Sequence, residues 1–138
     1  ATWQITGVQL EAGTIASDFE FLPHDVNLDR CHRYYQNYNT QNDKFITMGG
    51  YNASGFVYMW FRFYKTMRAN PSLEINTGSN YYRVFREGGH ANIDSLAIST
   101  NTPEGCMLYK SGGSGGSGAV AFLYTNNSDD YIAFSSEL

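Results

Sequence analysis

The 138-residue chain is poor in charge and has no long apolar run. Charged side chains make up only 16% of it, well below the usual quarter. Lys and Arg total 9 and Asp and Glu total 13, so the net charge is −4, whereas proteins that bind duplex nucleic acid carry a basic excess. No apolar run approaches the roughly 20 residues that span a bilayer. We therefore expect no nucleic-acid partner and no membrane insertion, and from the length one domain with a short appendage.

Cysteine is almost absent as well. Cys31 and Cys106 lie far apart, in neither a CxxC motif nor a Cys/His ligand spacing, so we expect no disulfide framework and no zinc site. Asp25, Asp29 and His32 would share one face of a helix, which a capped, solvated helix face explains better than a metal site does. We expect no metal and no cofactor.

The residues that are abundant predict an all-β domain. Aromatic residues make up 16% of the chain, and aromatic runs are separated by clusters of Asn, Gly and Ser. Strands are expected at residues 44–48, 56–64, 72–76, 81–86, 93–99, 106–110, 119–125 and 131–134. About eight short strands at this spacing predict a β-sandwich of jelly-roll type, and a closed barrel fits the spacing too.

One short helix is expected near the N-terminus. It begins after Pro23 with Asp25 as N-cap and ends near Arg33, and Cys31 would lie on its buried apolar stripe. Residues 34–38 fit either the last helical turn or a first strand. Residues 1–22 predict a strand and an extended segment, too few to form a domain, so we divide the chain into 1–22 and 23–138.

The strongest strand, residues 56–64, is apolar on both faces. One face would carry Val57, Met59, Phe61 and Phe63, and the other Phe56, Tyr58, Trp60, Arg62 and Tyr64. Because a strand with one wet face alternates between apolar and polar residues, we expect one face in the core and the other covered by a subunit, a loop or a ligand.

Three ordered motifs resemble bacteriophage tail fibre and tail-spike proteins. The first is WQITGVQLEAG at residues 3–13, followed by ASDFE at 16–20. The second is CHRYY at 31–35, and the third is MRANP at 67–71, where the family has Pro in place of the preceding Tyr64. The chain ends in FSSEL, similar to the Ala-Glu-Leu ending of such fibres.

The resemblance implies the C-terminal receptor-binding tip of a tail fibre, a homotrimer joined to an upstream shaft. Residues 1–22 would then close an upstream carbohydrate-binding-like domain, and residues 23–138 would form the β-sandwich tip. The expected location is the virion, at the fibre tip, acting on the outside of the host cell.

Candidate ligand-binding residues lie in the turns. If successive strands alternate in direction, the loops 49–55, 77–80, 99–105 and 126–130 share one end of the sandwich. Amides and tyrosines suit sugar hydroxyls and apolar sugar faces. The predicted ligand-binding residues are Tyr51, Asn52, Asn80, Asn101, Asn126, Asn127 and Asp130. This end is distal if residues 34–38 are helical. If residues 34–38 instead form a strand, the opposite end is distal, and the residues at the tip would be Asn39, Arg68, Asn70, His90 and Asn92.

Four arginines, Arg62, Arg68, Arg83 and Arg86, fall within one stretch and could grip an acidic sugar or a lipopolysaccharide phosphate. Ion pairing to Glu74, Glu87 or a neighbouring subunit is the favoured interpretation.

Three functional hypotheses follow. The first is a non-enzymatic adhesin that binds a bacterial surface glycan such as lipopolysaccharide or capsule. The second is a structural trimerisation or capping domain, with receptor binding upstream. The third is a glycan hydrolase, which needs paired carboxylates. The only adjacent pair is Asp129-Asp130, and neighbours on a strand point to opposite sides, so we expect no catalytic residues.

Overall fold

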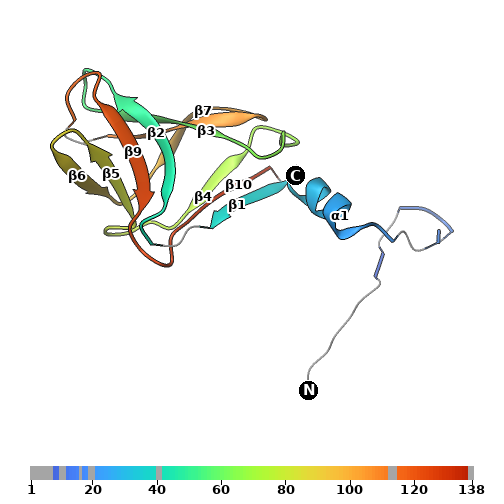
Figure 1. Cartoon of the computed structure of the whole chain (residues 1–138). Helices are drawn as coiled ribbons and strands as arrows, with labels where there is room; N and C mark the ends of the chain where they lie inside the picture. The colour runs from blue at the N-terminus through green and yellow to red at the C-terminus, as the bar shows by residue number, and fades with distance from the viewer. Residues whose placement is uncertain are drawn as a thin grey trace.

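The computed structural model describes residues 8–9, 12–15, 17–18, 21–39, 42–111 and 115–136. Within them lie one helix and ten strands (Figure 1). In chain order these are α1 (His24–Cys31), β1 (Tyr35–Asn39), β2 (Phe45–Tyr51), β3 (Val57–Arg62), β4 (Ser72–Ile75), β5 (Tyr82–Arg86), β6 (Gly89–Ile93), β7 (Ala97–Thr102), β8 (Gly105–Lys110), β9 (Val120–Thr125) and β10 (Tyr131–Ser135). Most of the expected segment 1–22, including its strand, lies outside the described residues.

The strands form two antiparallel sheets. The smaller has the order β1-β10-β4, and the larger has the order β6-β5-β9-β2-β3-β8-β7. The predicted all-β, sandwich-like fold with one short helix is thus confirmed.

The core lies between the sheets and is built as the alternation of β3 predicts. Val57, Met59 and Phe61 are buried, while Trp60 between them is exposed. From the smaller sheet, Phe134 meets them, with its ring centroid 5.0 Å from that of Phe61. The inward face assigned to residues 56–64 is therefore the core face.

The larger sheet must curl, because its two edge strands are consecutive in the chain. Only Asp94–Leu96 separate the end of β6 from the start of β7, which stand at opposite edges. Four residue steps reach about 14 Å. Seven flat strands would put their edges about 29 Å apart. The short connection therefore draws the edges together, so the sandwich approaches a barrel.

Two elements differ from the sequence-based expectation. Residues 93–99 do not form one strand, because β6 ends at Ile93 and β7 begins only at Ala97. β6 begins earlier than expected because a two-residue loop, Glu87 and Gly88, closes a tight hairpin, with Gly88 at φ +82°. Residues 35–39, left open above, form β1.

The helix is less integrated than its apolar spacing suggests. None of its residues is buried, and Cys31 is exposed, so its expected burial was wrong. In Figure 1, α1 extends beyond the end of the smaller sheet. Pro23 occupies the N-cap position without a side-chain hydrogen bond, and Asp25 lies in the first turn. Cys106, by contrast, is buried, which raises the pKa of its thiol to about 12.

Among the described residues, no helix has the length and apolarity to cross a bilayer.

Candidate functional site

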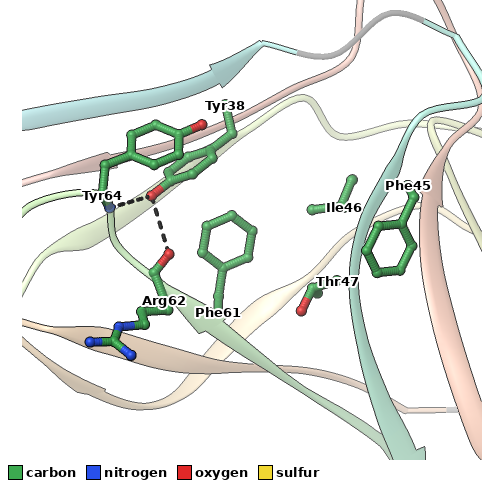
Figure 2. A pocket seen from close by; sticks show the side chains of 7 residues that line it. All are labelled: Tyr38, Phe45, Ile46, Thr47, Phe61, Arg62 and Tyr64. Atoms are coloured by element: carbon green, nitrogen blue, oxygen red, sulfur yellow. Dashed lines mark hydrogen bonds between the residues drawn. The ribbon is translucent and has the colours of Figure 1, made fainter.

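A groove opens between β2 and β3 because their ladder stops short. Both strands are described in full, and their pairing joins only residues 49–51 to residues 57–59. Beyond that point β2 stays paired with β9, through an irregularity in its register, and β3 stays paired with β8. The strands therefore diverge, leaving a groove of about 360 Å³ (Figure 2). Its lining residues are Tyr38, Phe45, Ile46, Thr47, Phe61, Arg62 and Tyr64.

One wall of the groove is a pair of tyrosines. The ring centroids of Tyr38, on β1, and Tyr64, just after β3, lie 4.1 Å apart. Tyr38 also meets the Phe61 ring edge-on at 4.5 Å. Tyr38 is held in place by its hydroxyl, which lies near the Tyr64 amide and the Arg62 carbonyl (Figure 2). Burial raises the pKa of Tyr38 above its ordinary value, so its phenol stays protonated.

A buried glutamine beneath this wall fixes the chain around it. The Gln36 side-chain oxygen accepts hydrogen bonds from the Tyr38 hydroxyl and the Tyr64 amide, both at 2.9 Å. Its amide group donates to the carbonyls of His32 at 2.9 Å and Lys65 at 2.6 Å. Because Gln36 is fully buried and its polar atoms are satisfied, it is a positioning residue that locks the β3–β4 connection against α1 and β1.

The opposite wall comes from the start of β2. Phe45 is 50% exposed, and its ring packs against the rings of Tyr124 and Phe122. The Thr47 hydroxyl donates to the Trp60 carbonyl and so bridges the gap where the ladder is missing. The buried ring of Phe61 lies between the two walls (Figure 2).

The groove combines ring surfaces with polar groups that have no partner in the described part of the chain. Tyr64 is 64% exposed, and no described residue bonds its hydroxyl. The Arg62 guanidinium is exposed and likewise unpaired among these residues, and in Figure 2 it points away from Phe45. The described lining residues include no carboxylate, imidazole or thiol. Such a lining suits a ligand with apolar faces and hydroxyl or acidic substituents, and it offers no acid–base pair.

The structure brings four of the seven predicted ligand-binding residues together, in the loops 76–81 and 126–130. The Asn126 side chain donates to the Asn80 carbonyl at 2.8 Å and accepts from Arg83. The Asn80 side chain accepts from Asn92 at 2.9 Å, and its φ is +66°. These amides bond neighbouring loops to each other, so they fix the loop geometry.

Asp130 is at the centre of this cluster and is fully buried. One of its carboxylate oxygens accepts the backbone amides of Asn126 at 2.9 Å and Asn127 at 3.0 Å. Burial raises the pKa of Asp130 above its ordinary value, and those two hydrogen bonds oppose the rise. The carboxylate therefore closes its own turn and presents no atom to solvent.

The other three predicted residues lie elsewhere. Tyr51 is 4% exposed, and its ring packs over Gly115. Asn52 accepts the amides of Ser54 and Phe56 and so shapes the β2–β3 turn. Asn101 donates to the Pro71 carbonyl at 2.7 Å.

The loop grouping behind the prediction was partly wrong. The β2–β3 turn lies at the same end of the larger sheet as the β5–β6 turn, opposite the loop 126–130. Strict alternation fails because β4 belongs to the other sheet and because Asp94–Leu96 cross between sheet edges. β1 leads away from α1 to Asn39, which pairs with Tyr131, so the loop 126–130 lies far from the helix although residues 35–39 are a strand.

The four arginines do not form one cluster in the structure. Arg83 pairs with Asp43 at 3.1 Å, and Arg68 lies over the Tyr34 ring at 5.7 Å. Arg86 lies at the β5–β6 turn, and Arg62 is at the groove. Among the described residues, no three His, Cys, Asp or Glu side chains are placed to hold a metal ion, and Asp29 pairs with Lys65 at 2.6 Å.

The groove residues Tyr38 and Phe45 were missed by the sequence reasoning. Tyr64 had been assigned to the second face of the strongest strand, and it lies at the groove. The position where β2 and β3 part is not marked by any residue pattern. The one usable signal for the groove is that aromatic residues flank both strands in the sequence.

Comparison of the chain with protein-family models, with curated proteins and with solved structures found no match. The resemblance to tail fibres therefore stands on the motifs of the sequence alone.

Proposed function

We propose that this chain is a non-enzymatic adhesin, the tip domain of a phage tail fibre, which binds a bacterial surface glycan such as lipopolysaccharide or capsule. The observation that supports glycan binding is the groove between β2 and β3. There, exposed aromatic rings lie beside polar groups that have no hydrogen-bond partner among the described residues. The virion location, the homotrimer and the upstream shaft are parts of this proposal that the sequence motifs support.

The groove supplies both components of sugar recognition. The rings of Tyr64 and Phe45 offer flat apolar surfaces against which the C–H face of a sugar can stack. The Tyr64 hydroxyl and the Arg62 guanidinium can bond hydroxyl or acidic groups at the sugar rim. Gln36 and Tyr38 hold the Tyr64 backbone in place, so little conformational freedom is lost when a ligand binds. Several copies on one virion would raise a weak affinity per site.

The test is binding of the full chain to an array of bacterial lipopolysaccharide and capsular saccharides. Calorimetric titration with the best saccharide would follow. Tyr64→Ala should weaken binding about tenfold, since an aromatic contact contributes on the order of 1 kcal/mol. Its melting temperature should change little, because Tyr64 is 64% exposed.

The matched control is Tyr35→Ala. Tyr35 is 38% exposed and lies on β1 in the smaller sheet, outside the groove. This variant should bind as the wild type does. Equal binding by all three proteins would refute the groove as the site, and no binding to any saccharide would refute the adhesin itself.

A structural capping domain is the second candidate, and a separate observation favours it. The outer face of the larger sheet carries exposed apolar side chains that no described element covers. A chain that assembles through this face but binds no saccharide would fit this candidate.

A further inference from the structure

We propose that the outer face of the seven-stranded sheet is a contact surface for a second copy of this chain. The inference does not depend on whether a glycan binds in the groove.

Apolar side chains form a row across five adjacent strands of this sheet. Phe85 pairs with Phe122, Phe122 pairs with Met48, and Trp60 pairs with Met107. Trp60 stands opposite Met48, one step beyond the last paired residues of β2 and β3. Since cross-strand partners share a face, all five side chains point away from the core.

A second row runs parallel to the first. Gly50 lies between Val120 on one side and Tyr58 on the other, and Tyr58 pairs with Tyr109. The rings of Tyr58 and Tyr109 are stacked, with centroids 6.0 Å apart. Rigid aromatic rings lose little conformational freedom when they are buried, as the residues of a contact surface should.

The exposure of the face is high for residues of this kind. Met48 is 54% exposed, Trp60 53% and Val120 53%. Five strands about 4.8 Å apart and five to seven residues long give a face of about 20 Å by 20 Å, on the order of 400 Å². Each partner in a stable interface contributes about 800 Å², so this patch has the size of an apolar interface centre with the flanking loops as its rim.

Charge favours a second copy over other occupants. The chain carries 13 carboxylates, yet none of the seven strands of this sheet contains Asp or Glu. Two copies can therefore meet through this face without bringing their carboxylates together, although each has a net charge of −4. An anionic lipid surface needs a cluster of cations. Here Arg62 and Arg83 lie apart, and Arg83 is already paired with Asp43.

The experiment measures the mass of the full chain in solution by light scattering, over a range of concentrations. We expect a mass of two or more copies for the wild type and of one copy for Met48→Lys and for Trp60→Lys. Met48→Lys is the milder change, because Met48 has no partner in the core. The control is Tyr35→Lys, the same kind of change on a strand of the smaller sheet, which should keep the wild-type mass.

A monomeric wild type at its highest soluble concentration would overturn the proposal. So would an assembly that both face variants leave intact while they remain folded. If the monomer instead binds phosphatidylglycerol vesicles, or a saccharide in a manner that Met48→Lys abolishes, the face has another occupant. Saccharide binding that is lost with Tyr64→Ala but kept in Met48→Lys would test the groove separately from this face.

Discussion

The groove and the asparagine-rich loops at residues 76–81 and 126–130 use their polar groups in opposite ways. In the loops, Asn80, Asn126 and Asp130 bond one another or the backbone of their neighbours. In the groove, the hydroxyl of Tyr64 and the guanidinium of Arg62 have no partner among the described residues. A residue type suited to recognition therefore says little by itself, because what matters is whether the fold has already used its hydrogen bonds.

The largest expected effect on stability comes from a substitution at Gly49, where the pairing of β2 with β3 ends and the groove begins. A side chain at Gly49, on the last paired step of β2 before the strands diverge, would overlap the Tyr58 carbonyl. Gly49→Ala should therefore destabilise the fold by about 3 kcal/mol or prevent folding, because backbone on both sides must shift. Thermal or urea unfolding measures this.

Gly50→Ala is its control. The nearest described atom to its new Cβ is the Ala119 carbonyl, at 3.5 Å, an ordinary contact. It should unfold close to the wild type. If both variants unfold alike, the close approach of β2 and β3 does not determine where the groove opens.

The next largest effect is expected for Tyr51→Ala, which tests whether Tyr51 is a recognition residue or a core residue. If both were ligand-binding residues, as the sequence predicts, Tyr51→Ala together with Asn127→Ala would lower cell adsorption without lowering the melting temperature. The structure changes that expectation. Because Tyr51 is 4% exposed, Tyr51→Ala alone should cost about 3 kcal/mol of stability.

Asn127→Ala is the useful contrast, since the Asn127 side chain accepts only local bonds, from Asp129 and Ser128. It should cost less than about 1 kcal/mol. Unfolding and saccharide binding are measured on each single variant. An Asn127→Ala protein that keeps its melting temperature but loses binding would restore the loops at residues 76–81 and 126–130 as the site.

The sequence predicted the elements far better than their assembly. The core face of β3, Val57, Met59 and Phe61, followed from alternation, because period two is a property of the strand itself. That β4 joins the smaller sheet, and that β2 pairs with β3 only from Gly49 onward, depends on contacts between residues far apart in the chain. No local pattern records those contacts.

The same limit applies to the site. Asn80 and Asn126 were expected to lie together, and they do, yet they are 46 residues apart and bond each other across two loops. Composition could identify amides in turns, but not that the amides satisfy one another. The strongest strand was expected to carry a second apolar face outside the core, and Trp60 on that face is 53% exposed. That a subunit, a loop or a ligand covers this face stays a prediction.

The smallest expected effect concerns pH and tests the closed character of the loop cluster. The pKa of Asp130 is raised above its ordinary 3.8, mainly by burial. The folded state therefore holds the proton more tightly than the unfolded chain does, so ionisation of Asp130 disfavours folding. Wild-type stability should fall, relative to Asp130→Asn, as the pH rises from below 3.8 through the raised pKa, and the difference should then level off.

Asp130→Asn keeps an oxygen that can accept the amides of Asn126 and Asn127. Both proteins contain the other carboxylates of the chain, so the titration of those groups cancels in the comparison. The melting-temperature difference between the two proteins, followed from acid to neutral pH, measures the effect. If the melting temperature of the wild type instead rises relative to that of Asp130→Asn as the pH rises, the two amides stabilise the anion more than burial penalises it. The carboxylate would then be a buried anion that its own turn stabilises.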